Sequence, residues 1–410
     1  MSGWLAYRWL AWVERMTVLA TRGKNVGIEC LRAFAVLGVL LEHARGNLFH
    51  DTDNVLNAIH ARFGFWWGVD LFFAVSGYVI ARSFLPRLDQ ARDRRESLGI
   101  LGAFWIRRCW RLLPSAWLWL GIVLVASVAF NRSNAFGSWH ANVMATLAGL
   151  FSVANFRLAQ TMFHSEYGAS FVYWSLSLEE QFYLLFPLLA FFFRRWLPWL
   201  IAVLALSQLF VIRTPWLMML RTDALALGVL LAMAEQRGWL LRWEPRSLAR
   251  RPVMQMLLVA AAFTGMAICC RDSLSLWRYR VGIIAVLAAF LVWLASYPAG
   301  YLPPHGPLRR LLAWIGARSY AIYLIHVPAF FFMREVCTRL LASGGIGQWP
   351  SAWLLVPTTL VLVMLLADAN YRLVETPLRR FGAGIASRFE RRRMQELPDE
   401  EGRAAVAAVA

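Results

Sequence analysis

The side chains best suited to chemistry in this sequence are ionisable residues inside long apolar segments. Arg32 and His43 stand eleven residues apart in the first such segment. Eleven residues of helix make three turns plus about 20°, so the two side chains share one face about 16 Å apart along the axis. An imidazole can act as a general base and a guanidinium can hold an anion, so the pair could serve the two ends of a long anionic substrate. Alternatively, Arg32 pairs with Glu29 one turn away and His43 is merely interfacial.

Two guanidiniums one turn apart form a second group. Arg108 and Arg111 precede Pro114, and we expect them at the cytoplasmic start of the third apolar helix, with Pro114 in its first turn. Paired guanidiniums at a helix start suit phosphate oxygens. The alternative is an ordinary positive-inside signal, which we favour for Arg107.

Two adjacent carboxylates form a third group, which we expect to open the fifth apolar helix. Glu180 and Tyr183 are one turn apart, so the spacing predicts that they share a polar pocket. Alternatively, the two acids only cap the helix start, where the macrodipole favours negative charge. The stretch reads Trp174-Ser175-Leu176-Ser177-Leu178-Glu179-Glu180-Gln181-Phe182-Tyr183.

Asp70 is an acid inside the second apolar segment. It shares a helical face with Ala74, Gly77 and Ala81, and small residues at this spacing predict close packing against another helix. Close packing does not explain a carboxylate, because an ionised side chain inside a membrane span is costly and usually functional. Asp70 is therefore a candidate pocket residue.

The composition indicates an integral membrane protein. Hydrophobic residues make up 59% of the 410, charged residues only 16%, and mean hydropathy is +0.51. A soluble domain carries about 25% charged and about 45–50% apolar residues. The chain has no cleavable signal sequence that we can identify, so we expect its first apolar helix to serve as an uncleaved anchor.

Eleven apolar segments predict an all-α, polytopic transmembrane helical bundle. Most are close to the roughly 20 residues that cross a bilayer. They are Val26–Ala44, Phe63–Phe84, Leu112–Phe130, Val143–Phe156, Leu178–Phe193, Leu197–Ile212, Leu217–Ala234, Val253–Cys270, Val281–Tyr297, Leu311–Met333 and Trp353–Val374.

The net charge of +18 comes mainly from arginines between the apolar segments, which indicates topology signals and argues against nucleic-acid binding. Three basic stretches lie on the same side of the membrane only if one apolar segment fails to cross. They are Arg82–Arg111, Arg237–Arg251 and the tail from Arg372. We therefore expect about 10 crossings with both termini cytoplasmic, the exception being Val143–Phe156 or Leu217–Ala234. Residues 1–25 form a cytoplasmic N-terminal segment and 26–380 the membrane domain. Residues 381–410 form a basic, then acidic, cytoplasmic tail that is either an amphipathic surface helix or disordered.

Cysteine usage predicts neither disulfides nor a metal site. The five cysteines are odd in number, lie mostly in or beside apolar segments and lack metal-ligand spacing. We interpret them as small apolar residues. We expect no tightly bound cofactor.

Taken together, these groups resemble the acyltransferase-3 family of membrane O-acyltransferases, which decorate surface glycans, peptidoglycan, nodulation factors and some antibiotics. The resemblance runs from about Gly27 to Arg380. Its motifs are Arg32 with His43, the stretch Gly68–Tyr78, the R-x-x-R of Arg108 and Arg111, Trp174–Tyr183, Arg221–Leu225, Ser319–His326 and Val374–Pro377.

The resemblance implies transfer of an acyl group, acetyl in the first instance, from acyl-coenzyme A to a hydroxyl of an envelope or exported glycan. His43 is our candidate base, since thioester-to-hydroxyl transfer needs one, and Glu180 is a second catalytic candidate. The resemblance implies that Arg108 and Arg111, with Arg32, hold the coenzyme A phosphates. The pocket residues are then Asp70, Ser177, Tyr183, Tyr323 and His326, with His326 either contacting the acceptor, orienting neighbours or packing structurally.

The resemblance places the chain in a bacterial inner membrane. Some relatives carry an esterase-like domain after the membrane part, so we expect the membrane domain here to bring donor and acceptor together by itself or with a partner. The main alternative is a transporter or flippase of a lipid-linked glycan. That class predicts related halves or correspondingly broken helices, which the sequence does not reveal.

Overall fold

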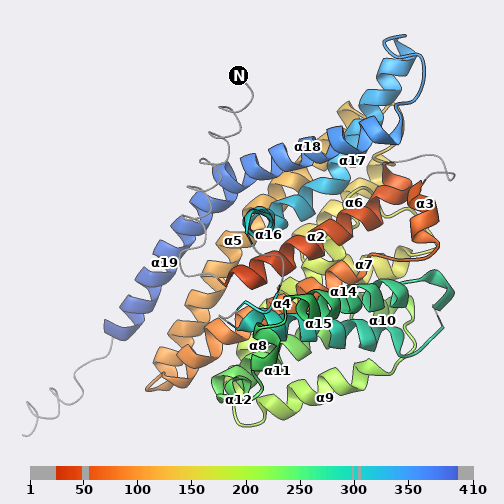
Figure 1. Ribbon diagram of the computed structural model, residues 1–410. Coiled ribbons are helices and arrows are strands. Elements are labelled where there is room, and N and C mark those ends of the chain that lie inside the picture. Colours follow the sequence, from red (N-terminus) through yellow and green to blue (C-terminus); the bar gives the residue numbers. More distant parts are fainter. Residues whose placement is uncertain (1–24, 49–54, 275, 298–299, 303–305, 396–410) are drawn as a thin grey trace, which may run out of the picture.

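The computed structural model describes residues 25–48, 55–274, 276–297, 300–302 and 306–395, and every regular element among them is helical (Figure 1). The predicted all-α class is therefore confirmed for the described chain, while residues 1–24 and 396–410 of the predicted terminal segments lie outside it. In chain order the elements are α2 (Val26–Asn47), α3 (Val55–His60), α4 (Trp67–Asp89), α5 (Arg94–Ala129), α6 (Trp139–Leu150), α7 (Ala154–Thr161), α8 (Tyr173–Phe192), α9 (Leu197–Leu209), α10 (Pro215–Met219), α11 (Asp223–Gln236), α12 (Trp239–Arg242), α13 (Arg246–Ala249), α14 (Pro252–Cys269), η1 (Asp272–Leu274), α15 (Arg280–Ser296), α16 (Pro307–Ala317), α17 (Ser319–Ala342), α18 (Ala352–Asn370), the π-helix η2 (Tyr371–Glu375) and α19 (Thr376–Gln395).

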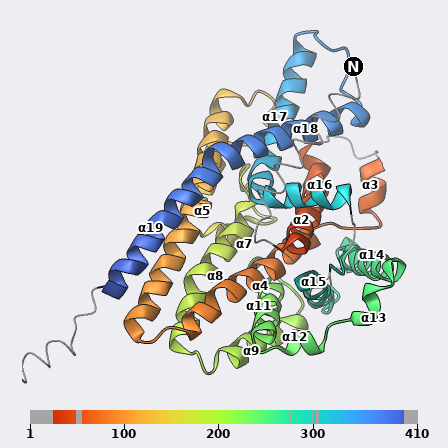
Figure 2. The same cartoon turned by 60° about the vertical axis from the view of Figure 1, so that its left-hand side comes forward.

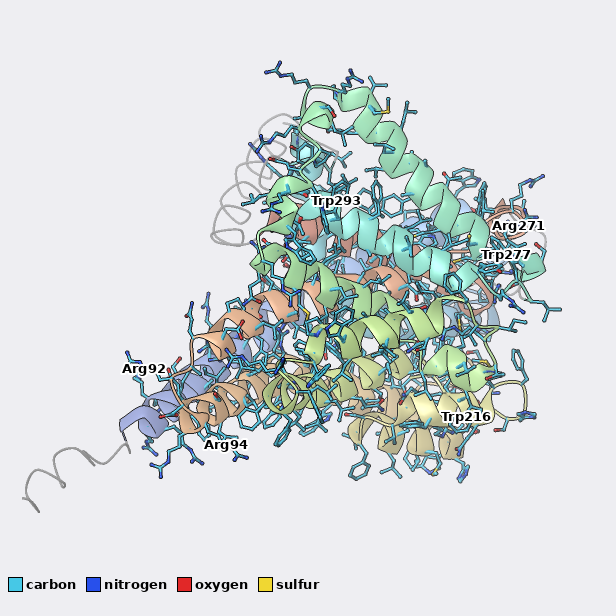
Figure 3. All side chains as sticks on the ribbon, turned by 90° about the horizontal axis from the view of Figure 1, so that it is seen from below. Arg92, Arg94, Trp216, Arg271, Trp277 and Trp293 are labelled. Carbon is cyan, nitrogen blue, oxygen red and sulfur yellow. The ribbon has the colours of Figure 1, made fainter. Side chains whose placement is uncertain are left out.

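The outer surface of the bundle is apolar, as expected for helices that face lipid. Trp353 is 90% exposed, Trp199 70% and Val125 66%. Six stretches in the described chain are long and apolar enough to cross a membrane: Trp67–Asp89, Arg94–Ala129, Pro215–Gln236, Pro252–Cys269, Ser319–Ala342 and Ala352–Arg393. The chain is thus a multi-pass membrane bundle. Arg92 and Arg94 lie at one end of it, and Arg271, Trp216 and Trp277 at the other (Figure 3).

Two long helices extend together beyond the rest of the bundle. α5 has 36 residues, and α18 continues through η2 into α19 (Figure 2). α19 lies against the first half of α5, where the rings of Trp110 and Phe381 are 4.9 Å apart and Gly102 leaves room for Phe389. Of the predicted tail, residues 381–395 therefore form a packed helix.

The expected start of the third helix is wrong. Asp93 caps α5, accepting a hydrogen bond of 2.7 Å from the Glu96 backbone N–H, so Arg108, Arg111 and Pro114 lie well inside the helix. Arginine is a good helix former, and the helix therefore continues far past the edge of its apolar half. The predicted basic loop Arg82–Arg111 consists mainly of the ends of α4 and α5.

Three apolar segments are interrupted. Val143–Phe156 divides into α6 and α7 at Ser152, whose φ of 56° is left-handed. Leu217–Ala234 divides into α10 and α11, and Leu311–Met333 divides into α16 and α17 at Arg318. Hydropathy averages over such breaks, because it senses side-chain polarity and not backbone conformation. Both segments predicted as candidates for not crossing are thus broken helices.

The small-residue face of α4 packs as predicted. A methyl group at Gly77 would overlap the Leu225 carbonyl of α11, and one at Gly228 of α11 would overlap the Ala74 carbonyl of α4. The two backbones are therefore in direct contact, which fixes α4 as one wall of the site described next.

Candidate active site

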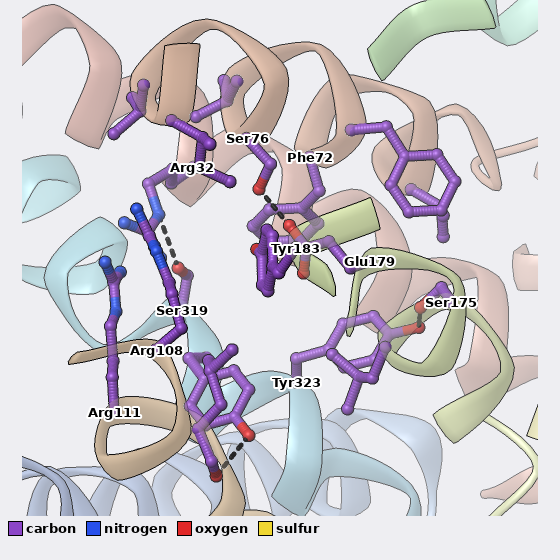
Figure 4. A pocket seen from close by; sticks show the side chains of 18 residues that line it. Arg32, Phe72, Ser76, Arg108, Arg111, Ser175, Glu179, Tyr183, Ser319 and Tyr323 are labelled. Carbon is purple, nitrogen blue, oxygen red and sulfur yellow. Dashed lines mark hydrogen bonds between the residues drawn. The ribbon is translucent and has the colours of Figure 1, made fainter. Parts of the chain in front are cut away.

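A cavity with polar and apolar walls lies among α2, α4, α5, α8 and α17 (Figure 4). It encloses about 720 Å³ of empty space, open solvent at its mouth included. Its polar lining residues are Arg32, Ser76, Arg108, Arg111, Ser175, Glu179, Tyr183, Ser319, Tyr320 and Tyr323, and apolar residues, mainly of α4, complete the wall. Segments from across the whole chain therefore meet at this cavity.

Three guanidiniums gather on one side of the cavity (Figure 4). Arg32 donates from Nε to the Ser319 hydroxyl at 3.2 Å, and Arg108 lies over the ring of Tyr183 at 5.2 Å. Among the described residues no carboxylate oxygen lies within 4.0 Å of these three side chains, and Arg111 Nε is buried without a hydrogen-bond partner. Clustered guanidiniums that no carboxylate contacts directly are costly in a low-dielectric setting, so the geometry favours an anionic ligand. The structure brings together the three arginines selected from the sequence.

The acid in the cavity is Glu179, which the sequence analysis did not select. Its Oε1 accepts a hydrogen bond from the Ser76 hydroxyl, and Tyr183 lines the same wall. α8 begins at Tyr173, so the expectation that the two acids open this helix is wrong. Positions 175, 179 and 183 then recur every four residues on one face, and this spacing was the available signal for Glu179.

Glu180 and Ser177, two of the selected residues, point away from the cavity lining. Glu180 Oε2 accepts from the Ser152 hydroxyl at 2.5 Å, and Ser177 Oγ accepts from the Ala154 backbone N–H at 3.2 Å. Gln181 donates to the Ser152 carbonyl at 2.8 Å. This face of α8 therefore binds the turn between α6 and α7. The motif Trp174–Tyr183 thus has one face toward the cavity and another toward this turn.

Asp70 is bound to Arg221 and does not line the cavity. Arg221 donates from Nε to Oδ1 at 2.8 Å and from Nη2 to Oδ2 at 3.0 Å. Both residues are almost completely buried, and the guanidinium also lies 4.8 Å from the Trp174 ring. A bidentate pair satisfies both charges, so Asp70 joins α4 to the start of α11. The motif Arg221–Leu225 supplies the partner that the sequence analysis lacked.

His43 and His326 form a hydrogen-bonded pair beyond the cavity wall. His43 Nδ1 lies 2.8 Å from His326 Nε2, and His326 Nδ1 lies 2.7 Å from the Tyr323 carbonyl oxygen. A carbonyl only accepts, so His326 Nδ1 carries the proton and, in a neutral ring, Nε2 accepts from His43 Nδ1–H. The basic nitrogen of neutral His43 is then Nε2. The two contacts thus fix the tautomer of both rings.

Tyr323 connects the histidine pair with the cavity. Its side chain lines the cavity and its hydroxyl lies 2.6 Å from Ser175 Oγ and 3.1 Å from the Val172 carbonyl. Its ring centroid lies 5.6 Å from that of His326. From one side to the other, the site therefore presents the three arginines, then Glu179 and Tyr183, then Tyr323, and finally the two histidines. This arrangement places guanidiniums on one side of Tyr323 and imidazoles on the other, the two side-chain types that Arg32 and His43 contribute.

The described residues contain no group of three or more His, Cys, Asp or Glu side chains that could hold a metal ion. The cysteines are free thiols, four of them buried and Cys109 exposed. None of them lines the cavity. The site as described consists of guanidiniums, imidazoles, hydroxyls and one carboxylate.

Comparison with known proteins gives a consistent result. Residues 25–368 match a family model described as "Acyltransferase domain". The chain is 28% identical over 389 residues to O-acetyltransferase OatA of Staphylococcus aureus (strain NCTC 8325 / PS 47), covering 87% of this chain and 57% of that protein. It is 29% identical over 387 residues to peptidoglycan O-acetyltransferase OatA of Listeria monocytogenes, covering 87% and 56%. The chain thus spans a little over half the length of these relatives. No solved structure matches it significantly.

Proposed function

The chain belongs to the acyltransferase-3 family, and on that premise we propose that it is a membrane O-acyltransferase. It moves an acyl group, acetyl in the first instance, from a coenzyme A thioester to a hydroxyl of a cell-envelope glycan. The names of the relatives favour acetyl as the group and peptidoglycan as the acceptor class. The donor is proposed from the chemistry of the cavity.

The observation that carries the proposal is the cluster of Arg32, Arg108 and Arg111 beside one cavity, without carboxylates in contact among the residues that the structure describes. Coenzyme A carries its phosphates at one end and its thioester at the end of a long flexible arm. Guanidiniums bind phosphate oxygens by charge-assisted, often bidentate hydrogen bonds. The phosphates would lie at the arginines and the thioester would point toward the imidazoles. The donor would then use both ends of the site, which Arg32 and His43 mark about 16 Å apart along α2.

The reaction follows from the tautomer of His43. Nε2 takes the proton from the acceptor hydroxyl as its oxygen bonds to the thioester carbonyl carbon. The tetrahedral intermediate then loses the C–S bond, and the departing sulfur takes the proton back from Nε2. The products are the O-acyl ester and free coenzyme A, so no external oxidant or reductant is required. His326 holds Nδ1–H of His43 and thereby keeps Nε2 available.

Glu179, Ser76 and Tyr183 form a polar wall next to the arginines. Their hydroxyl and carboxylate oxygens can accept hydrogen bonds from amide groups of the donor arm, which orients the thioester. Asp70, Ser177 and Glu180 act on the site only by holding its helices.

We further propose about 10 crossings with both termini on the cytoplasmic side of a bacterial inner membrane. The arginine-rich ends of α4, α5 and α19 lie together at one end of the bundle (Figure 2), as the positive-inside rule requires of cytoplasmic segments. The donor cavity is then open toward the compartment that supplies coenzyme A. Residues 26–380 carry the chemistry, and α19 extends beyond them.

The decisive experiment is acyl transfer by the purified protein in detergent. Incubation with acetyl-coenzyme A and a soluble glycan fragment should release free thiol in proportion to O-acetyl ester formed. His43→Ala should abolish both while leaving the thermal unfolding midpoint nearly unchanged. A transporter of lipid-linked glycan would consume no thioester, and unchanged turnover in His43→Ala would exclude His43 as the base.

A further inference from the structure

A second cavity lies beside the first, between α4, α5 and α19. It encloses about 710 Å³ of empty space, open solvent included. It is lined by Ser83, Phe84, Arg87, Phe104, Arg107, Arg108, Arg111, Arg379 and Ala383. Arg108 and Arg111 line both cavities, so the two cavities are adjacent and share these two guanidiniums.

The second cavity has more positive than negative charge. Glu390 contacts Arg87 and lies 3.6 Å from Arg107, and Glu375 lies 3.9 Å from Arg379. Two carboxylates thus face five guanidiniums, and Arg108 and Arg111 have no carboxylate within 4.0 Å in the described chain. A doubly charged anion would complement this surplus.

The order of groups along the two cavities matches the order of groups in the proposed donor. Residues 69–80 of α4 line the first cavity, and residues 83–87, farther along the helix, line the second. Tyr323, which contacts His326, lines only the first cavity. In space, the imidazoles come first, followed by the polar wall, the shared Arg108 and Arg111, and then the other arginines of the second cavity.

We propose that the second cavity holds the terminal phosphate monoester of the acyl donor. This inference rests on the proposed function and extends it to a subsite. Coenzyme A has a diphosphate within its chain and a phosphate monoester on its ribose, farther from the sulfur. The diphosphate lies at the shared Arg108 and Arg111, and the ribose phosphate lies between Arg107 and Arg379. α19 is therefore a wall of the donor site and not an appended tail.

The test measures binding of coenzyme A and of 3′-dephospho-coenzyme A to the purified full-length protein by calorimetry. Removing the phosphate should raise the Kd of the unaltered protein by roughly tenfold or more, as expected for a lost charge-assisted contact. Arg379→Gln should weaken coenzyme A binding by a similar factor and should leave dephospho-coenzyme A binding unchanged. Arg107→Gln is a second, independent variant that should behave in the same way.

Arg388→Gln is the matched control, because it removes the same charge from an exposed position of α19 outside both cavities. It should keep the full preference for coenzyme A. Equal affinity of the unaltered protein for both ligands would overturn the subsite, while leaving the proposed donor in place. An undiminished preference in both Arg379→Gln and Arg107→Gln would overturn it as well.

Two further results would point to a different ligand. If the unaltered protein binds neither coenzyme A nor its dephospho form, the proposed donor itself fails. Dioctanoyl phosphatidate also carries a phosphate monoester, but on a lipid. If it competes with coenzyme A, and dephospho-coenzyme A binds as tightly as coenzyme A, the cavity is a lipid headgroup site and the ribose phosphate does not occupy it.

Discussion

His43 Nδ1 lies 2.8 Å from His326 Nε2, and His326 Nδ1 donates in turn to the Tyr323 carbonyl. The second contact makes His43 the donor and His326 the acceptor of the bond between the two rings. We predict that His326→Leu lowers kcat for acyl transfer by about 10²-fold or more, because His43 then loses the acceptor that fixes its tautomer. His326→Gln can place an amide oxygen near the lost Nε2 and should recover much of the rate. Donor KM should change little in either variant. Equal losses of kcat in both variants, with a lowered unfolding midpoint, would indicate that His326 is only a packing residue.

Substitutions of the two adjacent acids of α8 should have different effects, on activity at Glu179 and on stability at Glu180. Glu179→Gln removes a charge from the cavity wall and should lower kcat/KM by roughly tenfold or more, without loss of stability. Glu180→Gln keeps an acceptor for the Ser152 hydroxyl and should retain activity, whereas Glu180→Ala should lower the unfolding midpoint. Steady-state kinetics and thermal unfolding of the three variants check this. An inactive but stable Glu180→Gln would restore Glu180 as a catalytic candidate.

The buried Asp70–Arg221 pair should control stability. Asp70→Ala leaves a buried guanidinium unpaired and should destabilise the protein by about 3–5 kcal/mol. Replacing both residues, as Asp70→Leu with Arg221→Met, should recover much of that loss, because no uncompensated charge remains. Thermal unfolding in detergent with a double-mutant cycle provides the measurement. A stable but inactive Asp70→Ala would return Asp70 to the substrate site.

Arg108→Ala and Arg111→Ala should each raise the donor KM by roughly ten- to a hundredfold, since a charge-assisted bond contributes about 1.5–3 kcal/mol. The acceptor KM should change less. Lysine should rescue only partly, because it keeps the charge but loses the two-pronged geometry. Arg95→Ala is the control, since Arg95 is an exposed arginine on the same helix. Full rescue by lysine would support a topology signal alone.

Topology can be tested with reporters. A phosphatase fused after Gln395 should be inactive and a fluorescent protein at the same position should fluoresce, because we place α19 in the cytoplasm. The exposed thiol of Cys109 should resist a membrane-impermeant maleimide in intact cells and react in inside-out vesicles. Labelling of Cys109 in intact cells, or an active phosphatase, would contradict the proposed sidedness.

The sequence predicted helices and the grouping of arginines well, because both depend on local features. Apolar length indicates a span, and Arg32, Arg108 and Arg111 are costly wherever they lie inside one. The start of α5 was missed, although Asp93 and Glu96 form a cap that is local in sequence, because the polar first half of α5 packs against α19, which is distant in the chain. The sequence also could not predict which side chains pair with one another. Asp70 looked unpaired until the fold brought Arg221 to it from 151 residues away along the chain.

The choice between Glu179 and Glu180 shows the same limit at a smaller scale. Both acids occur in one motif, and each lies about one turn from a plausible partner. A difference of about 100° around α8 decides which acid lines the cavity, and that rotation is set by contacts with α4 and with the α6–α7 turn. Ser76 and Ser152, the two partners, lie on those elements.

The continuity of α18, η2 and α19 has a mechanical consequence. The stretch Ala352–Arg393 is 42 residues long, which corresponds to about 63 Å of helix. One end presents Trp353 and Leu365 to lipid, and the other presents Arg379 to the second cavity. One continuous helix with a π-helical turn at η2 therefore links a lipid-facing surface to the second cavity. If a change in bilayer thickness tilts α18, Arg379 should move with it, and the lipid composition of the membrane should then alter the shape of the arginine-lined cavity.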